Sequence, residues 1–109
     1  MAESFAFVRK LGVRPDQFLE VLTESLFAAP IYRNYRSMIA HGNFDSVGFR
    51  LPLGLKDNRL LLSAADESSI PMPMASLVHD RFGAALAQGL GDSDWSVIAL
   101  IPYRSAGIE

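Results

Sequence analysis

Lys56 and Asp57 form the adjacent charged pair whose position in the sequence is best suited to binding a ligand. They lie in Gly54-Leu55-Lys56-Asp57-Asn58, near the predicted start of a helix whose next turns are apolar. The N-terminus of a helix carries positive partial charge, so a carboxylate is favoured there and a lysine gains nothing from the helix dipole. Two roles remain open for Lys56, a functional cation or a structural side chain beside the neighbouring carboxylate, and the residues alone favour the structural one.

A second candidate is the glycine pair in Gly89-Leu90-Gly91. A dinucleotide-binding loop places three glycines between a strand and a helix, where free backbone N–H groups meet the phosphates. This pair follows a predicted helix and lacks the third glycine. It therefore predicts a helix-ending turn rather than a phosphate loop.

The two histidines predict neither a metal site nor a hydrolytic site. His41 and His79 lack the paired spacing that places two ligands on one face of a helix. A triad built from His79 with Ser76 or Ser93 has no G-x-S-x-G elbow to support it. We therefore expect no metal ligand and no catalytic residue in this chain.

Three arginines, Arg33, Arg36 and Arg50, surround the polar segment from residue 43 to residue 51. Guanidinium groups near one loop can form an anion site, or they can belong to an ordinary charged surface. The ordinary surface is favoured, because arginine side chains are mostly exposed.

The elements that must position these residues are helices. Apolar residues recur with helical spacing along nearly the whole sequence, which predicts an all-α fold of five or six short helices in one domain. Val47-Gly48-Phe49-Arg50-Leu51 alternates as a strand would, but its glycine and the proline that follows argue against a sheet. Prolines suit the helix starts and glycines the helix ends. The expected helices span residues 2–11, 15–26, 30–41, 52–68 and 73–88, and a sixth is capped by Asp92 or Ser93.

The predicted core comes from the apolar faces of these helices. In the third helix Arg33 and Arg36 are expected on other faces. The predicted buried stripes are Phe18, Leu19, Leu22 and Leu26 in the second helix, Ile31, Tyr35, Met38 and Ile39 in the third, Leu77, Val78, Phe82, Ala85 and Leu86 in the fifth, and Trp95, Ile98 and Ile101 in the sixth.

The composition predicts one small domain over residues 1–109. Half of the residues are hydrophobic, the formal net charge is −2, and there is no cysteine. No basic stripe points to nucleic acid, and the lack of cysteine excludes disulfides and fits a reducing cytosol. No uncharged apolar run approaches the roughly 20 residues of a membrane span. We therefore expect a cytoplasmic protein with neither a membrane nor a nucleic-acid partner.

Four segments in order resemble the C-terminal domain of the β-hydroxyacid dehydrogenase family, which includes 3-hydroxyisobutyrate dehydrogenases and, more distantly, 6-phosphogluconate dehydrogenase. The similarity covers nearly the whole chain, and the order and spacing of the segments make it fairly specific. The segments are Glu3-Ser4-Phe5-Ala6-Phe7 with Lys10-Leu11-Gly12-Val13, then Phe44 to Leu55 leading into Lys56-Asp57, then Ile70-Pro71-Met72-Pro73, and finally Gly89 to Ser96.

The resemblance implies a helical domain that in the family follows a Rossmann domain absent from this sequence. It implies NAD or NADP as the cofactor and a small hydroxy acid as the substrate in the full-length context. It also implies that Lys56 reaches the bound dinucleotide, with Asp57 as a supporting residue. The family's catalytic lysine is absent, because Lys10 lacks the glycines and asparagine that surround it. Asn58 departs from the leucine that often follows Lys-Asp in the family.

We therefore expect the substrate- and cofactor-contacting and dimerisation domain of an NAD(P)-dependent 3-hydroxyacid dehydrogenase. Such a domain is expected to form a homodimer and to be inactive alone, since the redox chemistry belongs to the dinucleotide. The alternative is a stand-alone helical interaction module that kept the scaffold and lost the enzyme.

Overall fold

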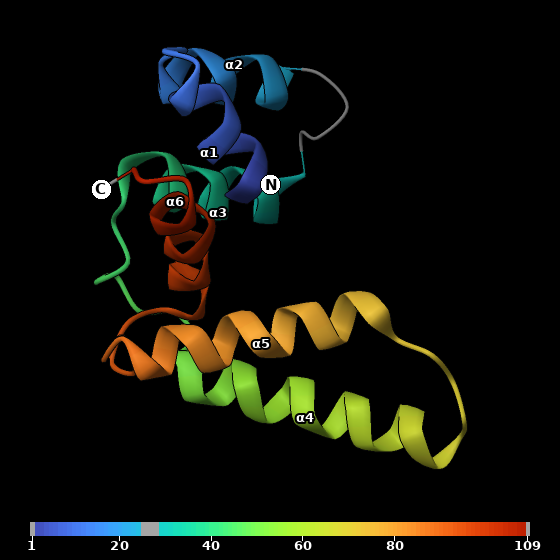
Figure 1. Ribbon diagram of the computed structural model, residues 1–109. Coiled ribbons are helices and arrows are strands. Elements are labelled where there is room, and N and C mark those ends of the chain that lie inside the picture. Colours follow the sequence, from blue (N-terminus) through green and yellow to red (C-terminus); the bar gives the residue numbers. More distant parts are fainter. Residues whose placement is uncertain (1, 25–28, 109) are drawn as a thin grey trace. The chain divides into compact units, whose positions relative to one another are not determined.

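The structure is a computed structural model that describes residues 2–24 and 29–108, and its regular elements are helices (Figure 1). Within these two ranges there is no strand, and the β-type pairing is one isolated antiparallel bridge between Arg50 and Asp94. The prediction of an all-α fold with five or six helices is confirmed. The elements are α1 (Ala2–Lys10), α2 (Pro15–Glu24), α3 (Pro30–His41), α4 (Leu51–Glu67), α5 (Pro73–Ala87), the 3-10 helix η1 (Trp95–Ala99) and α6 (Leu100–Ser105).

Proline and glycine set the helix boundaries as expected. Pro15, Pro30 and Pro73 each open their helix, where the missing N–H leaves no helical hydrogen bond unmade. Helix α3 ends at Gly42, whose left-handed φ of 68° lets its N–H donate to the Met38 carbonyl oxygen. The restricted backbone of proline and the permissive backbone of glycine therefore account for these helix boundaries without any tertiary contact.

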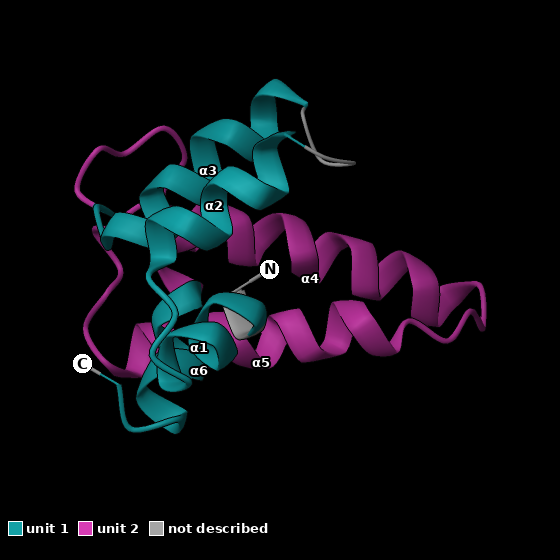
Figure 2. Cartoon of the chain, turned by 90° about the horizontal axis from the view of Figure 1, so that it is seen from above, with its two compact units in different colours: residues 1–44, 99–109 teal, residues 45–98 magenta. Residues whose placement is uncertain are grey.

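The chain divides into two compact units, which are coloured differently in Figure 2. Unit 1 comprises residues 1–44 and 99–109, and unit 2 comprises residues 45–98. Unit 1 contains α1, α2, α3 and α6, whereas unit 2 contains α4, α5 and most of η1. That residues 1–109 form one domain remains a prediction.

Aromatic and aliphatic side chains from several helices form the core of unit 1. The rings of Phe5 and Phe18 pack edge to face, with their centroids 5.0 Å apart. Tyr103 of α6 is 3% exposed, and its hydroxyl donates to the Ile39 carbonyl oxygen at 3.5 Å. Leu26, which was predicted on the apolar face of the second helix, lies outside the described residues.

The predicted buried stripe of α3 is partly wrong. Arg36 is fully buried, although it was expected on another face, and Ile31 is 61% exposed. Arg36 is long enough to bury its apolar stem, and its guanidinium carbon lies 5.3 Å from the centroid of the Tyr32 ring. The interpretation of Arg36 as part of an ordinary charged surface is therefore wrong as well.

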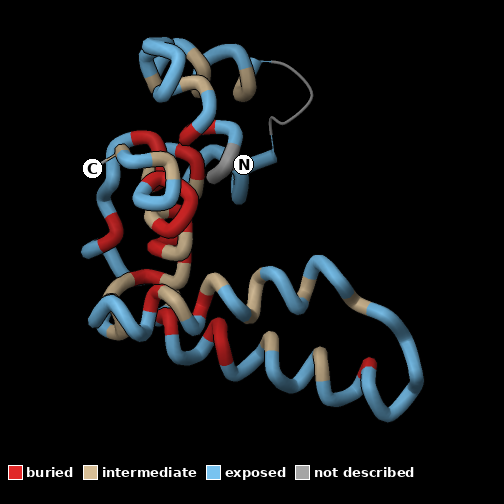
Figure 3. The backbone as a smooth tube through the Cα atoms, viewed as in Figure 1, coloured by how far each residue is buried: buried red, intermediate tan, exposed pale blue. Residues whose placement is uncertain are grey.

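Unit 2 is dominated by an antiparallel hairpin of α4 and α5 (Figure 1). Helix α4 begins and ends one residue earlier than predicted, at Leu51 and Glu67. Figure 3 shows that burial is concentrated in the half of the hairpin where α4 begins and α5 ends. There Leu51, Leu55, Phe82 and Ala85 are all at most 4% exposed.

The apolar face predicted for α5 is wider than the one the structure buries. Phe82 and Ala85 are buried, but the exposed fractions of Leu77 and Leu86 are 43% and 36%. A helix in a two-helix hairpin buries the narrow seam that meets its partner, so apolar side chains beside the seam stay exposed.

The predicted sixth helix is divided into η1 and α6. Ile101 is buried as expected, whereas Trp95 and Ile98 are half-buried. Val97, which the spacing did not select, is 1% exposed. The tighter turn of a 3-10 helix changes which residues share a face, which explains this difference.

Candidate cofactor-contacting site

Lys56 and Asp57 lie in the second turn of α4, which begins at Leu51. Both side chains are exposed. Across residues 2–24 and 29–108, neither side chain forms an ion pair or a hydrogen bond. The structural pairing that the sequence favoured for Lys56 is therefore not formed, and its ammonium group is open to an external anion.

Packing of the first turns of α4 directs this pair outward. Leu51 is fully buried and Leu55 is 4% exposed, so one face of the helix is held in the core of unit 2. Gly54, also buried, meets the Phe82 ring on the same inward side. Lys56 and Asp57 follow on the outward side because successive residues turn by about 100° around a helix.

Asn58 occupies the seam between α4 and α5. Its Nδ2 donates to the Ala75 carbonyl oxygen at 3.1 Å, and its Oδ1 is buried without a hydrogen-bond partner in the described residues. The position where the family often has leucine therefore holds an inter-helix hydrogen bond one residue after the Lys56-Asp57 pair. Sequence reasoning recognised the departure but not this contact.

Asp94 anchors the segment that leads into α4. Its Oδ2 accepts hydrogen bonds from the backbone N–H groups of Gly48 and Phe49 at 3.1 and 3.0 Å. Its Oδ1 accepts from the backbone N–H of Ser96 at 3.0 Å and from the Ser96 hydroxyl at 2.7 Å. Two segments nearly fifty residues apart are thus joined by one carboxylate, which is 1% exposed.

The environment of Asp94 favours its charged form. Burial alone would raise the pKa of this carboxyl, but the hydrogen bonds from Ser96, Phe49 and Gly48 outweigh it and lower the pKa below its ordinary value. The cap of the predicted sixth helix was expected at Asp92 or Ser93, but Asp94 is the residue that accepts a hydrogen bond from the first turn. The sequence could not reveal this, because half of its donors lie in the segment before α4.

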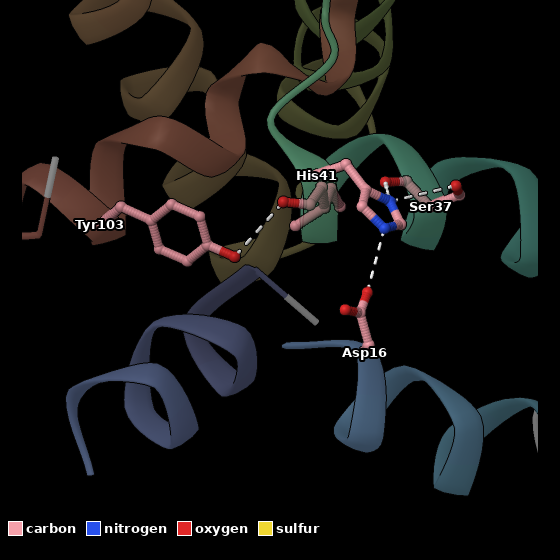
Figure 4. Close-up of polar contacts among 5 residues, drawn as sticks. Asp16, Ser37, His41 and Tyr103 are labelled. Atoms are coloured by element: carbon pink, nitrogen blue, oxygen red, sulfur yellow. Dashed lines mark hydrogen bonds and ion pairs between the residues drawn. The ribbon is translucent and has the colours of Figure 1, made fainter. Parts of the chain in front are cut away.

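The remaining candidates contribute elsewhere. His41 Nε2 lies 3.0 Å from Asp16 Oδ1 and its Nδ1 lies 2.8 Å from the Ser37 carbonyl oxygen, which ties α2 to α3 in unit 1 (Figure 4). Arg50 Nη1 donates to Asp92 Oδ1 at 3.0 Å. In the described part of the chain, no group of three or more metal-ligating side chains is found.

The exposed Lys56-Asp57 pair combines a cation with a hydrogen-bond acceptor. An ammonium group complements anionic phosphates, and a carboxylate accepts hydrogen bonds from hydroxyl groups. The described residues contain no strand that could lead into a glycine-rich phosphate loop, and Gly89 ends α5 instead.

Comparison with known proteins identifies the family of this chain. Residues 1–101 match the family model described as NAD-binding of NADP-dependent 3-hydroxyisobutyrate dehydrogenase. The chain belongs to this family.

No helix in the two described ranges is long and apolar enough to cross a membrane.

Relatives and a solved structure agree with the family model. The uncharacterized oxidoreductase YfjR of Bacillus subtilis is 39% identical over 90% of this chain and 34% of its own length. Glyoxylate/succinic semialdehyde reductase 1 of Arabidopsis thaliana is 28% identical over 89% of this chain and 33% of its own length. The crystal structure of 3-hydroxyisobutyrate dehydrogenase from Salmonella typhimurium has the same fold, with a TM-score of 0.82 over 92% of this chain and 35% of that one, at 24% identity. The chain thus spans about a third of the length of these proteins.

Proposed function

We propose that this chain is the substrate- and cofactor-contacting domain of an NAD(P)-dependent 3-hydroxyacid dehydrogenase, that it self-associates as a dimer, and that it is inactive alone. The observation that carries the proposal is the exposed Lys56-Asp57 pair, which has no partner among the described residues and lies on a helix anchored at its start. The family to which the chain belongs binds nicotinamide dinucleotides. Hydride transfer is the chemistry that the bound dinucleotide supplies.

In this proposal Lys56 contacts the dinucleotide as a compact positive charge, and Asp57 accepts a hydrogen bond beside it. Asp94 and Asn58 hold α4 in place, so that the pair is presented at a fixed position. The two-thirds of the relatives that the chain does not match would provide the phosphate loop and the catalytic lysine.

A chimera tests this assignment. The chain replaces the matching third of the Bacillus subtilis relative, which is 39% identical to it, and the binding of NADH and NADPH is followed by fluorescence titration. Lys56→Ala should weaken binding roughly ten- to a hundredfold, because a charge-assisted hydrogen bond is lost. Arg59→Ala, which removes an exposed cation from the next turn, is the matched control and should leave the affinity unchanged.

The two variants separate the proposed role from the alternatives. If Lys56→Ala binds both dinucleotides like the parent chimera, Lys56 is a surface residue and the assignment is wrong. If the folded parent chimera binds neither dinucleotide, the chain is better described as a helical interaction module. The isolated chain should not oxidise 3-hydroxyisobutyrate with either cofactor.

A further inference from the structure

A cavity in unit 1 lies beside the last turn of α6. Its volume is about 610 Å³, which falls within the range of roughly 300–1,000 Å³ that is usual for small-molecule sites. Leu100, Arg104, Gly107 and Ile108 line the cavity, and all four belong to unit 1. The cavity therefore shares no residue with the candidate cofactor-contacting site, which lies in unit 2.

The turn that ends α6 forms part of the cavity wall. Gly107 has a left-handed φ of 67°, which glycine adopts without strain, and its N–H donates to the Arg104 carbonyl oxygen at 3.0 Å. The N–H of Ile108 donates to the Tyr103 carbonyl oxygen at 2.9 Å. This pair of hydrogen bonds reverses the chain after the helix and returns the next apolar residue towards it. Ile108 and Leu100 are both half-buried, so the cavity has an apolar side.

Two cations lie at the cavity. Arg104 is exposed and follows Leu100 by one helical turn, so the two side chains share a face of α6. The ammonium nitrogen of Lys10 would lie 3.8 Å from a Cβ atom on Gly107. One of its N–H groups donates to the Ala106 carbonyl oxygen at 2.6 Å, and an ammonium group has three such donors. Lys10 can therefore keep this contact and also donate to a ligand.

The segments that carry these cations contain no balancing carboxylate. Residues 4–15 and 95–108 include no aspartate or glutamate, and Arg9 adds a third cation beside the Tyr103 ring. The C-terminus of a helix carries about half a negative charge, which favours cations in the last turn. The ends of α1 and α6 thus contribute roughly one negative charge, against the positive charges of Arg9, Lys10 and Arg104. The excess positive charge can attract an anion.

We propose that the cavity binds a small organic anion, whose charged group is held by Arg104 and Lys10 and whose apolar body lies against Leu100 and Ile108. A guanidinium group can hold a carboxylate through two parallel hydrogen bonds, and the ammonium group adds a further donor. The apolar side favours a ligand with several methylene groups, since each one removed from water adds to the affinity. The inference is independent of the proposed function, because it concerns the other unit of the chain.

Hexanoate, acetate and hexanol are probes that separate the charge from the apolar body. Each is titrated into the full chain, and the backbone amide resonances are followed by nuclear magnetic resonance. Hexanoate should shift the resonances of Gly107 and Ile108 and reach saturation. Its affinity should exceed those of acetate, which has little apolar body, and of hexanol, which has no charge, by at least about tenfold. If acetate or hexanol binds as tightly as hexanoate, the proposed ligand class is wrong.

Arg104→Gln tests the role of the guanidinium group. It should weaken the binding of hexanoate roughly three- to tenfold, because an exposed ion pair is lost, while circular dichroism shows that the helices remain. Arg59→Gln, which removes an exposed arginine from unit 2, is the matched control and should leave the affinity unchanged. If Arg104→Gln binds hexanoate like the parent chain, Arg104 serves only the helix end and the proposed site is wrong.

Ile108→Ser tests the apolar side and leaves both cations in place. It should weaken the binding of hexanoate by a similar factor and leave that of acetate unchanged, because only hexanoate reaches the isoleucine side chain. Hexanoate bound by Ile108→Ser as tightly as by the parent chain would overturn the placement of the apolar body. Resonance shifts confined to unit 2 would likewise overturn the proposal, because the anion would then bind elsewhere.

Discussion

Gly54 and Phe82 approach each other so closely that a Cβ atom on residue 54 would lie 2.9 Å from the Phe82 Cζ atom and 3.2 Å from the Trp95 Cβ atom. The Phe82 ring is 2% exposed, and its centroid is 6.4 Å from that of Trp95. The start of α4 is therefore held against α5 without room for a side chain. Since Lys56 comes two residues later, this contact helps to set its position.

Gly54→Ala should destabilise the chain by about 1–3 kcal/mol, because the added methyl group forces the buried Phe82 ring to move. Urea unfolding followed by circular dichroism measures this change. The matched control is Gly83→Ala in α5, where a Cβ atom would meet nothing within 4 Å. That substitution should stabilise the chain by about 0.5–1 kcal/mol, since alanine favours the helix interior over glycine. Equal effects at the two positions would contradict the close packing at Gly54.

Asp94 should make the stability of the chain fall in acid. Burial raises the pKa of this carboxyl, but the hydrogen bonds from Ser96, Phe49 and Gly48 lower it further than burial raises it. The unfolded chain therefore binds a proton at a pH where the folded chain does not. The contribution of Asp94 is complete above the ordinary carboxyl pKa and is lost as the pH falls through the lowered one.

Asp94→Asn should remove this part of the pH dependence and destabilise the chain by about 1.5–3 kcal/mol at neutral pH. Unfolding midpoints measured from neutral to acidic pH test the prediction. Asp92→Asn, which alters an exposed pair with Arg50, is the control and should leave the slope unchanged. An unchanged slope in Asp94→Asn would show that other carboxylates cause the acid sensitivity.

Asn58→Leu should raise the stability by about 1 kcal/mol. The substitution removes an amide oxygen that is buried without a partner among the described residues. The Ala75 carbonyl oxygen loses the Asn58 hydrogen bond but remains part of helix α5. Chemical unfolding measures the gain. Asn58→Ala should instead destabilise the chain, because it leaves a cavity in the seam. A loss of stability in Asn58→Leu would mean that the Asn58–Ala75 hydrogen bond outweighs the buried oxygen.

The Tyr103 hydroxyl should ionise above the ordinary pKa of a tyrosine. Burial raises the pKa of its hydroxyl above the ordinary value, and the nearby Arg9 guanidinium opposes this only in part. Because the folded chain holds this proton more tightly, the stability that Tyr103 provides is lost as the pH rises above the ordinary tyrosine pKa. Titration of the phenolate absorbance should show a late phase that is missing in Tyr103→Phe. Retention of that phase in Tyr103→Phe would show that it does not come from Tyr103.

Local sequence signals were sufficient for the helices but not for every contact. Pro30, Pro73 and Gly42 act through backbone geometry alone, so the boundaries near them could be predicted. The exposed position predicted for Arg36 from the helical periodicity was wrong, because a long side chain can bury its stem and place its charge over Tyr32.

The candidate site was predicted only in part for a related reason. The sequence indicated Lys56 and Asp57 but could not show that they are exposed and have no partner among the residues that the structure describes. Asp94 was missed because the backbone groups that identify it, those of Gly48 and Phe49, are brought to it by folding. Long-range hydrogen bonds of this kind have no local sequence signature.

The division of the chain into units implies an order in which its parts can be completed during synthesis. Every contact within unit 2 is available once residue 98 has left the ribosome, because the unit is continuous in sequence. Unit 1 needs α6, and Lys10 Nζ donates to the Ala106 carbonyl oxygen, 96 residues further along, at 2.6 Å. The contacts of the helices before residue 45 with α6 can therefore form only after all of unit 2 has been synthesised.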